Sequence, residues 1–133
     1  MAASPEYTSR PINADVLIST ANANRDGTGT LGTAYTFTAG GRGGRIDAVT
    51  IQAIGTTTAG MVRMFINGVL RREWLVAALT PSATVKAFTV QAADGADANG
   101  RVAMGIVCKP GDVVAFSTHN AESFQCVVEG GEF

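Results

Sequence analysis

The chain has 133 residues, with 10 Lys and Arg against 11 Asp and Glu, one His, two Cys and 46% hydrophobic residues, which suits one domain with its own hydrophobic core. A net charge of −1 offers no basic field to a nucleic acid or an anionic membrane, so neither is expected as a main partner. The apolar runs are far shorter than the roughly 18 residues that a membrane span needs. The N-terminus lacks the pattern of a secretory signal, so we expect cytosolic synthesis.

The start of the chain is predicted to be an extended arm. Prolines at Pro5 and Pro11 each remove a backbone donor and restrict the residue before them. We therefore predict an N-terminal arm over residues 1–11 and a single β-sandwich domain over residues 12–133.

The body of the chain predicts short strands. Apolar and polar residues alternate with a period of two, most clearly at Val49, Ile51 and Ala53, which fall on one face of a half-buried strand. Asn67-Gly68 predicts a type I′ hairpin turn, and Lys109–Asp112 predicts a further turn at a Pro-Gly pair. The predicted strands cover residues 15–20, 35–38, 45–54, 61–66, 69–78, 84–92, 101–108, 113–118 and 123–128.

These elements predict an all-β fold, an antiparallel two-sheet β-sandwich of jelly-roll type with an extended N-terminal arm, and an up-and-down barrel is the alternative. No stretch has the pattern of a crossover helix. The 21 Ala, 16 Gly and 15 Thr suit thin sheets, tight turns and pliable loops better than a bulky helical core.

Three glycine-containing segments resemble ligand motifs and are interpreted as loops. Residues 27–32 match G-x-G-x-x-G, but β-branched and aromatic residues follow where the dinucleotide motif opens a helix. Residues 42–45 form one Arg-Gly-Gly-Arg unit, too little for a single-strand binder. Residues 94–100 lack the ligands of an EF-hand loop.

The residue types of an active site are scarce. His119 is the only histidine, so one chain cannot build a two-His metal cage such as a cupin-like enzyme uses. Ser117 and Ser123 have only Glu122 as a local acid for a triad. Cys108 and Cys126 occupy apolar strand positions, where reduced core thiols are expected, with a disulfide possible only if their strands are neighbours. We expect no enzyme activity, cofactor or metal.

Arginine and tryptophan suggest protein contacts instead. Eight of the ten Lys and Arg are Arg, which binds protein partners bidentately and by stacking. Trp74 is either a core residue or an anchor at a subunit interface, and residues 6–13 are expected to add a strand to the sheet edge of a neighbouring subunit. The candidate contact residues for a capsid or a second subunit are Glu6, Tyr7, Arg10, Arg25, Arg42, Arg45, Arg71, Arg72 and Trp74.

From about Arg45 to Phe133 the chain resembles small virion proteins of tailed bacteriophages. The resemblance is carried by residues 55–68, 77–87, 109–124 and 129–133, which include Thr80-Pro-Ser-Ala-Thr84 and the closing Glu129-Gly-Gly-Glu-Phe133. It implies a β-sandwich subunit on the virion, a capsid decoration or cement protein that trimerises over the lattice of the major capsid protein, and it carries over no catalytic residues. The alternative within the same class of particle is a receptor- or glycan-binding head of a tail fibre or spike, which predicts exposed aromatic side chains at Trp74, Tyr7 or Tyr35.

Overall fold

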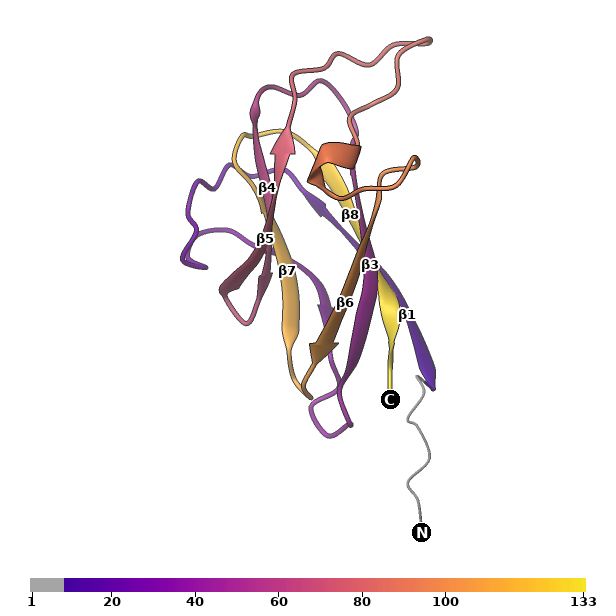
Figure 1. Ribbon diagram of the computed structural model, residues 1–133. Helices are drawn as coiled ribbons and strands as arrows, with labels where there is room; N and C mark the ends of the chain where they lie inside the picture. The colour runs from indigo at the N-terminus through magenta and orange to yellow at the C-terminus, as the bar shows by residue number, and fades with distance from the viewer. Residues whose placement is uncertain (1–8) are drawn as a thin grey trace.

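Short β-branched and aromatic runs, separated by turn residues, form eight strands in the computed structural model, which describes residues 9–133. Within these residues, η1 is a 3₁₀ helix of three residues, and no helix is long and apolar enough to cross a bilayer. The elements, shown in Figure 1, are β1 (Arg10–Ile18), β2 (Gly32–Thr36), β3 (Gly44–Ala53), β4 (Gly60–Ile66), β5 (Val69–Val76), η1 (Ala92–Asp94), β6 (Arg101–Cys108), β7 (Val113–Thr118) and β8 (Phe124–Glu132).

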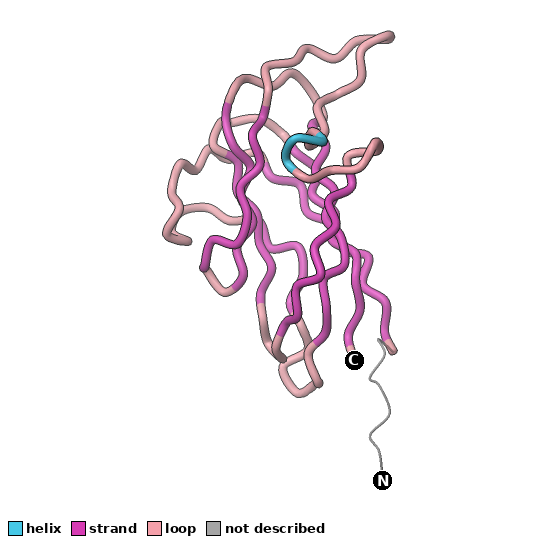
Figure 2. Tube along the Cα trace, in the orientation of Figure 1, coloured by secondary structure: helices cyan, strands magenta, loops and turns pink. Residues whose placement is uncertain are grey.

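The strands form two four-stranded antiparallel sheets with the orders β1-β8-β3-β6 and β2-β7-β4-β5. The first strand pairs with the last, the second with the seventh, the third with the sixth and the fourth with the fifth. Two further pairs, β3 with β8 and β4 with β7, complete the sheets. Figure 2 shows the two layers of strands with loops gathered at both ends. The predicted two-sheet β-sandwich is confirmed, and the closed barrel is not formed.

The core lies between the sheets and is built from the alternating apolar positions that the sequence indicates. Val49, Ile51 and Ala53 of β3 are buried, as are Val62 and Met64 of β4. Aromatic rings contribute to it: at one end of the sandwich, Phe88 and Phe124 meet edge to face with ring centroids 6.4 Å apart. Much of the core volume thus comes from a few large side chains, and most of the Ala and Thr lie in the loops, since β4, β5 and β8 contain neither residue.

Both predicted turns are present. Asn67 and Gly68, with φ of 52° and 76°, join β4 to β5 in the left-handed conformation that a type I′ turn requires at both positions. In the second turn Gly111 has a φ of 83°, and the Lys109 amide donates to Oδ2 of Asp112 at 2.8 Å. The Asn67 side chain links the two turns, because its Nδ2 donates to Oδ1 of Asp112 at 2.8 Å.

Several predicted element bounds are corrected; among them, β5 ends at Val76 rather than at residue 78, and β8 covers Phe124–Glu132 rather than residues 123–128. The segment 84–92 is a loop rather than a strand, although Phe88 and Val90 are buried on one side as expected; an isolated bridge between Gln52 and Thr89 is its only ladder pairing among the described residues. The strand predicted over 35–38 begins three residues earlier, at Gly32, and ends at Thr36.

The first strand also begins earlier than predicted, at Arg10, so Arg10 and Pro11 belong to the sandwich and not to an arm. Residues 10–13 pair with β8 of their own chain on one side, and as part of the edge strand β1 they have no strand on the other side. Pro11 is tolerated because β1 is an edge strand. Residues 1–8, with Glu6 and Tyr7, lie outside the described residues.

The two cysteines are buried, free and far apart. Cys108 pairs with Gly44 on one side of β3, while Cys126 pairs with Ile51 on the other side. Seven residues along β3 correspond to about 23 Å, whereas a disulfide needs Cα atoms within about 7 Å. The strands of the two thiols are not neighbours, so the expectation of reduced core cysteines holds in this fold.

Candidate functional site

The loop 19–31, between β1 and β2, packs over the outer face of the sheet β2-β7-β4-β5 (Figure 1). Asn22 anchors it: the Asn22 amide donates to the Thr118 carbonyl at 2.8 Å, and its Nδ2 donates to the carbonyls of Thr28 and Thr30 at 3.0 and 2.9 Å. At Gly27 an added Cβ would lie 2.2 Å from the Gly68 carbonyl oxygen. The loop therefore reaches the β4–β5 turn and buries side chains that point away from the core.

Arg63 is the most deeply buried charge on this face. It alternates with the core residues Val62 and Met64, so it points outward under the loop, where its side chain is 0% exposed. Nε donates to Oε1 of Glu73 at 2.8 Å, and Nη1 donates to the Asn22 carbonyl at 3.2 Å. A charge in such a place must be paired and hydrogen-bonded, and Arg63 satisfies this with one carboxylate and the loop backbone.

Glu73 is shared between two arginines. Its Oε1 accepts from Arg63, and also from Nε of Arg25 on the loop at 2.5 Å. The hydrogen bond from Arg63, followed by that from Arg25, lowers the pKa of the Glu73 carboxyl below its usual value. Two guanidinium groups against one carboxylate leave this cluster with a net positive charge.

His119 completes the cluster. Its Nδ1 lies 3.3 Å from Nη2 of Arg63. A guanidinium only donates, so Nδ1 is the acceptor in this contact and Nε2 is the ring nitrogen that can donate. The exposed His119 ring therefore presents Nε2–H as a donor.

A surface groove of about 340 Å³ opens beside this cluster. Its floor is apolar, formed by Met61 and by Leu75, which is 56% exposed. The side chains that line it are either apolar or carry a hydrogen-bond donor, and no carboxylate is among them. They are Arg25, Ala59, Met61, Arg63, Leu75 and His119, with the Gly60 backbone. The groove can accept an apolar group together with an acceptor oxygen or a negative charge.

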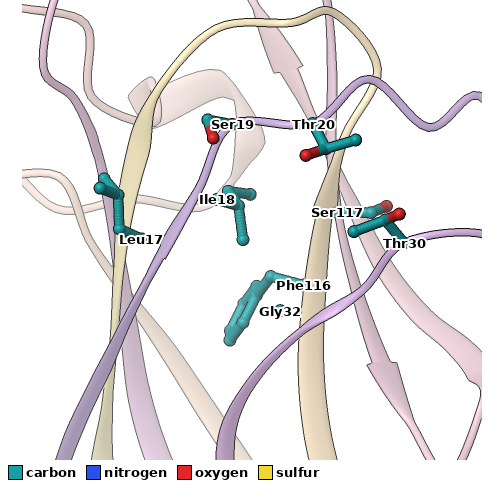
Figure 3. Close-up of a pocket in the computed structure, with 8 residues that line it drawn as sticks. All are labelled: Leu17, Ile18, Ser19, Thr20, Thr30, Gly32, Phe116 and Ser117. Atoms are coloured by element: carbon teal, nitrogen blue, oxygen red, sulfur yellow. The ribbon is translucent and has the colours of Figure 1, made fainter.

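A second, smaller cavity of about 100 Å³ lies where the loop leaves β1 and enters β2 (Figure 3). Ile18 and Phe116 form its apolar side, and the hydroxyl-bearing Ser19, Thr20 and Thr30 line it. The Ser117 hydroxyl is buried here, and its oxygen has no hydrogen-bond partner in the protein. In Figure 3 the Ser117 and Thr30 side chains lie on the same side of the cavity.

At the end of the sandwich away from the groove, Glu132 is the centre of a hydrogen-bonded cluster, and its side chain is 4% exposed. The Tyr35 hydroxyl donates to its carboxylate, as does the Thr38 amide at 3.0 Å, and Arg10 lies 3.7 Å away. The Tyr35 hydrogen bond is the main reason that the pKa of Glu132 is lowered. Burial, followed by the bond to Glu132, raises the pKa of Tyr35 to about 12. This cluster joins the C-terminal strand to β2.

The predicted contact residues occupy separate places rather than one surface. Arg10, Arg42 and Arg45 lie at the Glu132 end, where Arg45 pairs with Asp47 at 2.6 Å and Arg42 is exposed in the β2–β3 loop. Arg71 and Arg72 are exposed on the edge strand β5. Among the predicted contact residues that the structure describes, only Arg25 contributes to the groove.

Trp74 is not available as a contact anchor. It is 1% exposed and belongs to the core, because it alternates with Glu73 and Leu75 on β5 and points between the sheets. Sequence reasoning missed Arg63, Glu73 and Asn22 as members of a site. A signal was present in β4, where Phe65 lies on the same face as Arg63, opposite the core residues Val62 and Met64. A large apolar residue on the outer face of a strand indicates that another segment of the chain covers that face.

Comparison with known proteins finds no matching family model, no matching curated protein and no matching solved structure. Across residues 9–133, no group of three or more His, Cys, Asp and Glu gathers in a way that could hold a metal ion. Ser117 belongs to β7, whereas His119 follows the end of that strand, and the hydrogen bond of its ring goes to Arg63.

Proposed function

We propose that this protein is a non-enzymatic structural component of a tailed-bacteriophage virion, a capsid decoration or cement protein that binds neighbouring major capsid subunits as a trimer. Its place is the capsid surface, and its synthesis takes place in the host cytoplasm. The proposal starts from the resemblance of residues 45–133 to small virion proteins and gains support from the strand pairing.

The strand pairing is the observation that carries the proposal. The strands pair as in one long hairpin that is rolled into two sheets: β1 with β8, β2 with β7, β3 with β6 and β4 with β5. This pairing supports assignment to the jelly-roll class. Jelly rolls of eight strands occur in viral capsid and lectin domains and in cupins. A virion subunit is one established use of this architecture.

Exposed apolar side chains at sheet edges support protein contacts. In the sheet β1-β8-β3-β6 both edge strands carry one: Leu17 on β1 is 54% exposed and Val107 on β6 is 71% exposed. Unpaired strand edges are templates for contacts with other chains. They provide this subunit with surfaces for neighbours on two sides.

The mechanism would be stabilisation by binding. A protein that binds only the assembled lattice stabilises that lattice by its binding free energy, about 2.7 kcal/mol per site when its concentration is a hundred times the Kd. No bond has to be made or broken, and no cofactor is required.

Co-sedimentation with capsids that lack the protein tests the proposal. We expect saturable binding and a higher capsid melting temperature. Arg42→Glu should weaken binding at least tenfold, whereas the matched change Lys86→Glu, in an exposed loop that meets β3 at Gln52, far from the β2–β3 loop, should not. Wild-type protein that stays in the supernatant at every concentration would overturn the proposal.

The tail-fibre alternative depends on aromatic side chains that can stack on sugars. Trp74 is buried, and Tyr35 is partly buried with its hydroxyl bound to Glu132; Tyr7 lies outside the described residues. The observed aromatic positions thus favour the capsid proposal. A specific hit on a glycan array, together with no capsid binding, would reverse this order.

A further inference from the structure

The groove beside Arg25, Arg63 and His119 has the chemistry of a peptide-binding site. Its floor is apolar at Met61 and Leu75, and every polar side chain that lines it is a donor. The complementary ligand is a carboxylate next to an apolar or aromatic side chain, because a carboxylate accepts from guanidinium and from imidazole N–H.

The segment that precedes the described residues contains such a pair. Residues 1–8 read Met-Ala-Ala-Ser-Pro-Glu-Tyr-Thr, in which Glu6 is the only charged side chain and is followed by Tyr7. A carboxylate beside a phenol ring matches a groove with a cationic rim and an apolar floor.

The geometry excludes the groove of the same chain. Arg10 begins β1, and Ile18 ends it eight residues later, about 26 Å away along the strand. Ile18 lines one cavity with Ser117, and Ser117 pairs with Arg63 beside the groove, so the groove lies level with the far end of β1. The four residues from Glu6 to Arg10 span at most about 14 Å. Glu6 therefore reaches a groove only in another molecule.

We propose that Glu6 and Tyr7 of one subunit occupy the groove of a second copy of this chain, with the Glu6 carboxylate at Arg25 and His119 and the Tyr7 ring on Met61 and Leu75. The contact joins two different surfaces and is heterologous, so it closes into a ring when the rotation between copies permits. This inference rests on the proposed trimer and identifies the contact that would build it.

Cross-linking between two full-length variants tests the contact. Tyr7→Cys and Leu75→Cys are purified separately, mixed and oxidised. We expect a disulfide-linked dimer of the two variants on a non-reducing gel, because a bond forms only where Cα atoms approach within about 7 Å. The native Cys108 and Cys126 are buried and do not contribute.

The matched control replaces Leu75→Cys with Val107→Cys, which places a thiol at a more exposed position on the opposite sheet. The Tyr7–Leu75 mixture should cross-link at least tenfold faster than the Tyr7–Val107 mixture, and adding Glu6→Gln to the Tyr7 variant should remove most of this advantage, about tenfold for a lost charge-assisted hydrogen bond. Equal rates in the two mixtures would overturn the inference.

Capsid binding separates this inference from the proposed function. Protein that cross-links through Leu75 but does not sediment with capsids supports the contact of Glu6 and Tyr7 with the groove and overturns the capsid role. Protein that binds capsids but cross-links equally at Leu75 and Val107 overturns only the contact of Glu6 and Tyr7 with the groove.

Discussion

Arg63 and Glu73 face each other across the β4–β5 hairpin, and Nε of Arg63 donates to Oε1 of Glu73 at 2.8 Å. The guanidinium is fully buried, whereas the carboxylate is 28% exposed. Removal of one partner of a buried pair leaves an uncompensated charge, which costs far more than the loss of an exposed pair. Replacing the Glu73 carboxylate by an amide should therefore lower the free energy of unfolding clearly.

Glu73→Gln should therefore lower the free energy of unfolding by about 2 kcal/mol, below the 3–5 kcal/mol typical of fully buried pairs because Glu73 is partly exposed. The matched control is Asp47→Asn, which removes an exposed pair with Arg45 whose side chains are 49% and 41% exposed and should change stability by no more than about 0.5 kcal/mol. Urea unfolding at pH 7 measures both. Equal midpoints for the two variants would contradict the burial argument.

Acid should destabilise the protein through Glu73 and Glu132. Both carboxyls have folded-state pKa values below the ordinary 4.5, so the unfolded chain binds more protons and stability rises with pH in that range. The contribution is complete above about pH 4.5 and is lost as the pH falls through the folded-state values. Urea midpoints from pH 7 to pH 3 should decline less steeply in Glu132→Gln than in wild type. Parallel profiles would exclude Glu132 as a source of the decline.

Alkaline titration should report the burial of Tyr35. Its pKa is raised from 10.0 to about 12, so its contribution to stability is complete below pH 10 and is lost as the pH rises toward 12. In Tyr7→Phe, which removes the only other tyrosine, tyrosinate absorbance should have its midpoint near pH 12 in the folded protein. A midpoint near 10 with the fold intact would show that Tyr35 is not buried against Glu132.

The native thiols should resist modification. Burial raises the pKa of Cys108 to about 11 and raises that of Cys126 further. For Cys108, only about a thousandth is thiolate at pH 8, and both side chains are inaccessible. A thiol reagent such as DTNB should detect no thiol in native protein and two per chain in denaturant. One fast-reacting thiol in the native state would indicate that β6 or β8 opens locally.

Removal of the Ser117 hydroxyl should not destabilise the protein. Its oxygen is buried without a partner, so Ser117→Ala should be neutral or stabilising by up to about 1 kcal/mol. The matched control is Thr118→Val, which also deletes a buried hydroxyl, but one that donates to the Asn120 carbonyl at 2.9 Å, and it should cost about 1 kcal/mol. Thermal unfolding of the two variants gives the comparison. A loss at Ser117 as large as that at Thr118 would mean that the Ser117 hydroxyl is bonded in solution.

Local patterns predicted the elements that local chemistry controls. The strands β6 and β7 have the predicted bounds, because each is a short apolar-rich run between turn residues, and the Asn67-Gly68 turn follows from the need for two positive φ angles. The segment 84–92 has the same alternation at Phe88 and Val90 but forms a loop, since burial of alternate side chains does not by itself provide a paired strand on either side.

The sequence by itself determined the all-β class, the near-neutral net charge and the scarcity of catalytic residue types, because composition and a period of two depend on each residue and its near neighbours. The sheet orders, the covering of one sheet face by the loop 19–31 and the meeting of Arg25, Arg63, Glu73 and His119 were decided only by the tertiary structure. Arg25 and Glu73 are 48 residues apart. Contacts between residues so far apart in the sequence depend on how the strands pair and pack, and a local sequence pattern does not contain this information.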